Sequence, residues 1–250
     1  MRRQMRSEVR PEVRSQELNF MKRGRPRSHL PDAALAAVGL RLLETYAGLA
    51  ERGEHLLGQL FAGHAPRQWA HYPEEDAIDL SSGYQWFYHS HSPEDRPGAV
   101  EHGHVHLFAR RTLWGRRLHS RSERAFAELC GNPCAKPMTR HLITIGFDAK
   151  GVPISLFTVN SWVTGDLMLG AELSLELLES MTLDTGHPEI DAVIESVVRL
   201  CAPELRELMR RRDDALRSHR APDKLHDETL ELLSEIHIDL DAKLTALSAA

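Results

Sequence analysis

Alternating histidines in one stretch constrain this chain more than any other feature. The stretch covers residues 84–108, reads YQWFYHSHSPEDRPGAVEHGHVHLF, and holds five of the fifteen histidines in the 250-residue chain. These five are His89, His91, His102, His104 and His106. Because side chains alternate between the two faces of a β-strand, the first two histidines share one face and so do the last three. We expect two antiparallel strands here, at about residues 84–91 and 102–110, joined as a hairpin.

The register of that hairpin decides whether the two groups of histidines meet. If the numbers of paired residues add to 193, His91 lies opposite His102 and His89 lies opposite His104. A slip by one residue would turn the two groups to opposite faces of the sheet. We predict the first register, with all five imidazoles on one surface.

Imidazoles at this spacing favour a metal site. Residues i and i+2 of a strand start about 6.8 Å apart and can converge on one ion, whereas residues i and i+4 start about 13.6 Å apart. The predicted ligands are His89, His91, His102 and His104, with His106 as an alternative ligand. Nitrogen donors suit a divalent transition metal, with Zn or Fe expected first, rather than Mg or Ca. Glu101 is expected to reach around the strand end as an acceptor for a ligand or as the catalytic base.

Two functions fit such a cluster. A metal with an open coordination position supports a metal-dependent hydrolase or oxygenase acting on a small-molecule substrate. A closed shell, or a metal-free cluster of hydrogen-bonded imidazoles, suits a non-catalytic metal- or pH-responsive module that could form a homodimer. The chain lacks G-x-S-x-G, H-E-x-x-H and glycine-rich phosphate-binding motifs, which excludes the enzyme classes that depend on them.

Composition describes an acidic protein with a basic beginning. The net charge is −5 and 42% of the residues are hydrophobic, so the chain can bury a sizeable core. We see no run of eighteen apolar residues and no secretory signal, and three cysteines do not suggest a disulfide framework, so we expect a cytoplasmic protein without a membrane partner.

Residues 1–28 carry nine Lys and Arg against three Glu and are predicted to form a disordered tail. Met21 could serve as an alternative start. Residues 22–27 read KRGRPR and resemble the core of an AT-hook, which binds the minor groove of A·T-rich DNA. Nucleic acid is therefore expected as a partner only through Arg23, Arg25 and Arg27.

The remainder, residues 29–250, is predicted to be a single α+β domain with a central antiparallel sheet of about four strands in two hairpins. Helices are expected both before and after the strands in the sequence, and to pack against the sheet. The second hairpin covers residues 141–147 and 153–160, around a turn at 148–151. Helices are expected at about 31–62, 122–129, 166–181, 189–202, 203–218 and in a final segment after 225. Thr164 is a candidate N-cap, and Asp239 is expected to cap a last short helix.

Other polar residues are weaker candidates. His141 shares the expected face of Ile143 and Ile145 and is a candidate outer ligand if the second hairpin pairs beside the first. Asp76 and Asp79 could orient an imidazole or bind a metal, although loop acids usually serve turns. A C-x3-C pair, Cys130 and Cys134, lacks the second pair that a zinc knuckle requires.

Four groups of residues together resemble a bacterial domain-of-unknown-function family over roughly residues 30–245. They are His71-Tyr72-Pro73, Tyr84-Gln85-x-x-Tyr88-His89-x-His91, Glu101-His102-Gly103-His104-x-His106-x-Phe108 and Leu156-Phe157-Thr158-x-Asn160-x-Trp162-Val163-Thr164-Gly165. The resemblance implies no activity or ligand, but it suggests that Asn160, Trp162 and Thr164 belong to the same surface as the histidines. Ser161 stands where the resemblance leads us to expect a basic residue, so the chain has no charged side chain at that position.

Overall fold

The computed structural model describes residues 32–61, 63–90, 101–132 and 138–249. His91, Cys134 and the basic tail with its AT-hook-like segment lie outside these ranges. By its contacts the chain divides into Met1–Pro31 and Asp32–Ala250, and the architecture below is that of the second unit.

One antiparallel sheet forms the centre of the α+β fold. Its six strands lie in the order of the chain, so that each strand pairs with the next. The strands are β1 (Tyr72–Ile78), β2 (Tyr84–Ser90), β3 (Gly103–Arg110), β4 (Thr139–Phe147), β5 (Pro153–Val159) and β6 (Leu232–His237). The four central strands are those that the alternation of apolar residues predicts.

The two edge strands correct the expectation of about four strands. β1 has the sequence YPEEDAI, whose proline and acidic residues are typical of a loop. Only Ala77 of this strand is buried, so the sequence lacks the apolar alternation that predicts a strand. The helical spacing of Leu232, Leu233 and Ile236 predicts a helix where the structure has β6. Pairing with β5 along Ser155–Val159 determines the outcome, which shows tertiary context overriding a short ambiguous pattern.

Helices precede, interrupt and follow the strands. They are α1 (Asp32–Arg52), the 3-10 turn η1 (Gly58–Leu60), α2 (Arg111–Trp114), α3 (Arg121–Leu129), α4 (Ser161–Thr164), α5 (Ala171–Glu179), α6 (Pro188–Leu200), α7 (Ala202–Ser218) and α8 (Leu240–Ser248). Asp239 caps α8 as predicted, by accepting a hydrogen bond from the Ala242 amide. Thr164 does not cap the next long helix, because it ends α4 while α5 begins only at Ala171.

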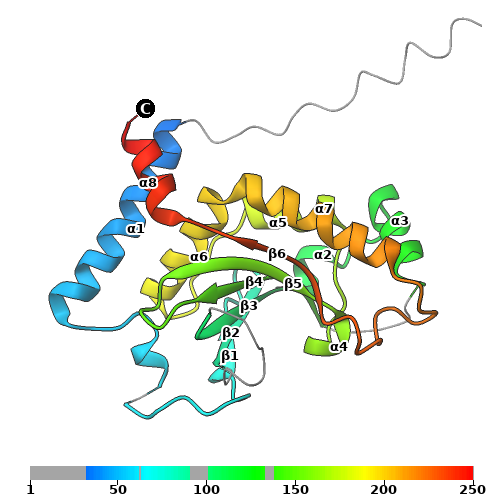
Figure 1. Ribbon diagram of the computed structural model, residues 1–250, viewed down its shortest axis with the longest axis horizontal. Coiled ribbons are helices and arrows are strands. Elements are labelled where there is room, and N and C mark those ends of the chain that lie inside the picture. The colour runs from blue at the N-terminus through cyan, green and yellow to red at the C-terminus, as the bar shows by residue number, and fades with distance from the viewer. Residues whose placement is uncertain (1–31, 62, 91–100, 133–137, 250) are drawn as a thin grey trace, which may run out of the picture. The chain divides into compact units, whose positions relative to one another are not determined.

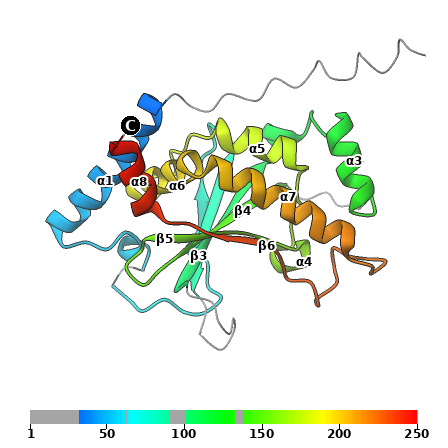
Figure 2. The ribbon, with the colours of Figure 1, turned by 45° about the horizontal axis from the view of Figure 1, so that its top comes forward.

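The main core lies between the sheet and the helices that cover one of its faces. Figures 1 and 2 show α5, α6 and α7 on the same side of the sheet. On this side the Trp86 indole is fully buried and its Nε1 donates to Asp191 Oδ1 of α6 over 2.9 Å. Alternate residues of β2 and β3 therefore enter this helix-covered core, which leaves the histidines on the opposite face.

Helix α1 combines an apolar composition with one packed side. By length and composition it is the one described helix that could cross a membrane. Its Leu42 and Leu49 are buried against the core, while Leu40 and Leu43 are exposed. Arg41 forms an ion pair with Glu195 of α6 over 2.5 Å, which ties α1 to the helical layer.

Candidate metal centre

Two neighbouring strands bring three histidines together. In the β2–β3 ladder His89 pairs directly with His104 and Ser90 with Gly103, so the predicted register, with residue numbers adding to 193, is confirmed. His106 lies two residues beyond His104 on the same face. These three side chains are 8%, 3% and 1% exposed, respectively.

The three Nε2 atoms form a small triangle. His89 Nε2 lies 2.6 Å from His104 Nε2, which lies 3.1 Å from His106 Nε2, and the third edge is 3.3 Å. Each imidazole nitrogen carries either a proton or a lone pair, so protons alone cannot satisfy all three edges at once. A cation can accept all three lone pairs. Three nitrogens on a tetrahedral ion with bonds near 2.1 Å would lie about 3.4 Å apart, close to two of the observed edges.

A second layer orients His106. Its Nδ1 lies 3.1 Å from Thr144 Oγ1 and 3.2 Å from His141 Nε2. Burial, helped by the charge of Arg212, lowers the pKa of His141 to about 3, so this imidazole is neutral and its Nε2 can accept. When His106 Nδ1 donates to this acceptor, the Nε2 of His106 carries a lone pair that faces the other two rings. Metal-binding histidines commonly use their second nitrogen in this way.

A β-bulge places His141 on the histidine face. The expectation that His141 shares a face with Ile143 and Ile145 is wrong, although its expected position beside the cluster is correct. In the β3–β4 ladder Leu107 pairs with Ile143 whereas Phe108 pairs with His141, so one extra residue lies on β4. The extra residue shifts the alternation, since two residues of one strand oppose one of the other.

Aromatic rings surround the three imidazoles. Phe87 lies 5.1 Å from His106 between ring centroids, and Phe157 lies 5.1 Å from His104. Trp69 approaches His89 edge-on at 6.1 Å. These apolar walls lower the local polarity, and an apolar surrounding strengthens the binding of an ion to its ligands and controls access of water.

His71 stands at the edge of this aromatic group. Its ring stacks on Phe87 at a centroid distance of 3.7 Å and an angle of 8°. Its Nδ1 lies 3.1 Å from Asp76 Oδ1, so the expectation that Asp76 orients an imidazole is confirmed. Asp79, by contrast, accepts hydrogen bonds from Ser81, Ser82 and Asp184 and serves a turn.

Glu101 lies beside His104. The carbons Cβ and Cγ of Glu101 are 3.3 and 3.6 Å from the position that a Gly146 Cβ would occupy. Gly146 pairs with His104, and paired residues share a face, so the Glu101 side chain covers the histidine face of the sheet. The absence of a side chain at Gly146 makes room for it.

His102 differs from its expected place. It precedes β3, its side chain is exposed, and its amide donates to the Phe147 carbonyl over 2.7 Å. The pair that converges with His89 is therefore His104 and His106, not His102 and His104. Among the described residues, the three buried histidines are the group whose ligand atoms could hold one ion.

Sequence comparison places this site within a family. Residues 36–238 match the family described as Domain of unknown function (DUF6969). The chain belongs to this family. No curated protein and no solved structure matches the chain.

The DUF6969 span contains every strand of the sheet, His71, Glu101 and the three clustered histidines. It also contains Asn160 and Trp162, whose side chains bind backbone carbonyls of another segment. Asn160 Nδ2 donates to the carbonyls of Lys224 and Leu230, and Trp162 Nε1 donates to the same Leu230 carbonyl. These residues hold the segment that leads into β6, while Thr164 Oγ1 accepts from the Asp166 amide.

Proposed function

We propose that this protein is a metal-dependent enzyme whose ion, Zn or Fe(II), is held by His89, His104 and His106. The mutual approach of the three Nε2 atoms to within 2.6–3.3 Å carries this proposal. An all-nitrogen set suits these metals and disfavours Mg and Ca. Such an ion, when bound with a free coordination position, acts as a Lewis acid that activates water or a substrate oxygen.

The residues around the three histidines have properties that suit distinct roles in such an enzyme. Glu101 lies on the histidine face beside His104, where its carboxylate would accept a proton from a bound molecule. The hydrogen bonds of Thr144 and His141 hold the His106 ring in one orientation. Phe87 and Phe157 restrict water and favour a small substrate with an apolar part.

The burial of the three rings favours a second candidate, a structural or regulatory metal site without catalysis. Each ring is at most 8% exposed, and structural metal sites are closed to substrate. The two candidates share the same three ligands. They differ in whether the ion has a coordination position that an external molecule can occupy. Binding of a small anion such as azide to the Co(II)-substituted protein, seen as a change in the visible spectrum, would support the enzyme.

Metal analysis of protein purified without a tag tests the common basis of both candidates. We expect close to one equivalent of Zn or Fe, lost in His104→Ala and in His106→Ala. His102→Ala is the matched control, because this neighbouring histidine is exposed and lies outside the triangle. Absence of metal from the folded wild-type protein after incubation with Zn(II) and with Fe(II) would reject the proposal.

A further inference from the structure

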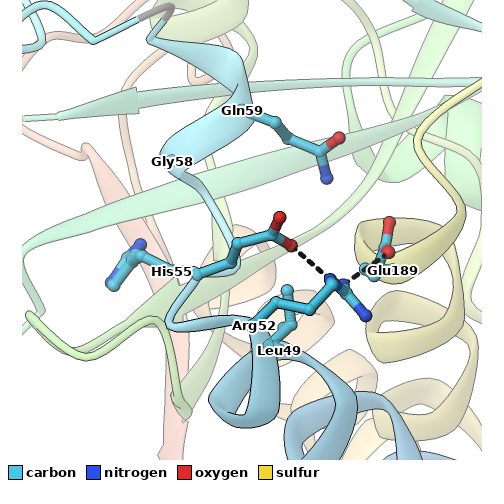
Figure 3. A pocket seen from close by; sticks show the side chains of 7 residues that line it. Leu49, Arg52, His55, Gly58, Gln59 and Glu189 are labelled. Carbon is cyan, nitrogen blue, oxygen red and sulfur yellow. Dashed lines mark hydrogen bonds and ion pairs between the residues drawn. The ribbon is translucent and has the colours of Figure 1, made fainter.

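A second kind of site is indicated by a cavity whose two charged side chains form no ion pair with each other. A larger pocket, between the end of α1 and the start of α6, differs in this respect and has a volume of about 550 Å³. Arg52 of this pocket forms ion pairs with Glu54 and with Glu189, and Figure 3 shows the pair with Glu189. Charged side chains that neutralise one another in this way require no charged ligand.

The other cavity lies between α3 and the start of β4 and measures about 120 Å³. Phe126 and Ala127 of α3 form one wall, and Met168 and Leu225 contribute further apolar surface. Two charged residues, Glu123 and Arg140, also line it. The volume equals that of about four water molecules in the liquid, so only a small molecule fits.

Arg140 presents a guanidinium to this cavity that is only partly engaged by the protein. The residue is 5% exposed, its guanidinium stacks on the Trp114 ring at 4.0 Å, and Nη1 donates to the Thr139 carbonyl. Within the described part of the chain, Nε and Nη2 make no hydrogen bond and no carboxylate comes within ion-pair distance. Asp166 and Glu123 act on this charge only from beyond ion-pair distance. A buried charge without a direct partner is costly, and the planar fork of arginine matches a carboxylate.

Glu123 offers acceptors on the same cavity. The residue is 4% exposed, and both of its carboxylate oxygens accept from the Gly170 amide, over 3.0 and 3.2 Å. A carboxylate has about four acceptor positions, so capacity remains for a donor on a ligand. Because no direct ion pair joins Glu123 to Arg140, a dipolar ligand can lie between them.

We propose that this cavity binds a small carboxylic acid with an α-amino or α-hydroxyl group and a short branched hydrocarbon chain. The ligand carboxylate pairs with Arg140, and the α-substituent donates to Glu123. The hydrocarbon lies against Phe126 and Met168. This site is independent of the metal centre, since it shares none of the three histidines.

Calorimetric and thermal-denaturation titrations of the full chain test the ligand class. The probes are L-valine, 2-hydroxyisovalerate, isovalerate without the α-donor, and isobutylamine without the carboxylate. We expect the first two to bind, isovalerate to bind at least about fivefold more weakly, and isobutylamine not to bind. If neither of the first two binds at millimolar concentration, the proposal is overturned. Equal binding of isovalerate would remove the assigned role of Glu123.

Two variants locate the ligand by different means. Arg140→Gln removes the guanidinium and should weaken binding at least about tenfold. Ala127→Leu fills the cavity from a half-exposed helical position, so the fold should tolerate it while binding is lost. Arg124→Gln, on the exposed side of α3, is the control that should bind as the wild type does. Unchanged affinity in either folded cavity variant would place the ligand elsewhere and overturn the proposal.

Discussion

His89 Nε2 lies 2.6 Å from His104 Nε2, between two residues that pair directly across β2 and β3. The rings meet edge to face, with centroids 4.4 Å apart and planes at 72°. The contact joins two strands that are consecutive in the chain. Their relative position therefore controls the candidate site, and changes in strand pairing should be visible as changes in metal binding.

Gly103→Ala should disturb both properties. A Cβ at this position would lie 2.1 Å from the Tyr88 hydroxyl oxygen and 2.7 Å from the backbone oxygen of His89, so β2 and β3 must separate. We expect a loss of about 1–3 kcal/mol in the free energy of unfolding and at least about tenfold weaker metal binding. Gly58→Ala is the control, because its Cβ would meet only an ordinary contact at 3.5 Å. Wild-type metal affinity in Gly103→Ala would contradict the dependence on strand position.

Thr144→Val should separate metal affinity from overall folding. The substitution removes the hydroxyl that lies 3.1 Å from His106 Nδ1 and 3.2 Å from His141 Nε2. Loss of such a supporting hydrogen bond weakens metal binding by about 10- to 100-fold. The matched control is Thr158→Val on β5, whose hydroxyl bonds to Ser234 instead. Competition titrations with a chromophoric chelator should show weakening only in Thr144→Val.

Removal of the proposed metal should lower thermal stability. An ion at a free concentration 100 times its dissociation constant adds about 2.7 kcal/mol to the native state. For a chain of this size we expect the melting temperature to fall by about 5–10 °C in chelator. Because imidazole must be deprotonated to bind, the difference should shrink as the pH is lowered through about 6. His104→Ala should melt at one temperature with and without chelator.

Asp79 should make stability depend on pH. Burial alone would raise the pKa of this carboxyl, but the hydrogen bonds from Ser82 and Ser81 together outweigh it and hold the pKa well below its ordinary value. Because the pKa of Asp79 is lower in the folded than in the unfolded protein, its ionised form stabilises the fold. This contribution is complete at pH values above the pKa in the unfolded protein, near 3.9, and is lost as the pH falls toward the pKa in the folded protein. Asp79→Asn should cost about 2–3 kcal/mol at pH 7 by urea unfolding, and less at pH 3.

Asp223→Asn provides the comparison for that experiment. This aspartate is exposed and pairs with the exposed His226, so its replacement should leave unfolding unchanged within about 0.5 kcal/mol. A loss in Asp79→Asn that stays constant between pH 7 and pH 3 would contradict the assigned role of the ionised carboxylate.

Two thiols should be inert in the folded protein. Burial raises the pKa of Cys130 to about 11 and that of Cys201 to about 12. At pH 8 about one Cys130 thiol in a thousand would be ionised, and thiolate is the reactive form. Iodoacetamide labelling followed by peptide mass spectrometry should show both residues modified only after unfolding in urea. Rapid labelling of either residue in native buffer would show that its burial is not maintained.

Much of the central sheet could be predicted from residue alternation. Trp86 and His89 of β2 lie on opposite faces of the strand, and the parity of His89 and His104 leaves only odd sums of paired residue numbers if the two are to meet. Burial of one face makes that register specific, because a slip would put imidazoles into the helix-covered core. The central strands and the paired histidines followed from this reasoning.

Strand ends and short ambiguous patterns could not be predicted in the same way. His102 continues the alternation in sequence, but β3 begins only at Gly103. Residue spacing cannot locate the end of a strand to within one residue. The β6 pattern fits helix and strand equally, and only pairing with β5 decides between them. The family resemblance links Asn160 and Trp162 with the histidines, whereas their side chains donate to the Lys224 and Leu230 carbonyls of the segment before β6.

The bulge between β3 and β4 makes the support of His106 depend on which residue of β4 stays unpaired. Uninterrupted alternation of the same residues would place Leu142 opposite Phe108 and turn His141 toward the helix-covered core, so that Thr144 alone would support His106. Deletion of Leu142, in contrast, would remove the bulge and leave His141 opposite Phe108 on the histidine face. A relative with a β4 shorter by this one residue would therefore keep the same layer of support without this irregularity in the sheet.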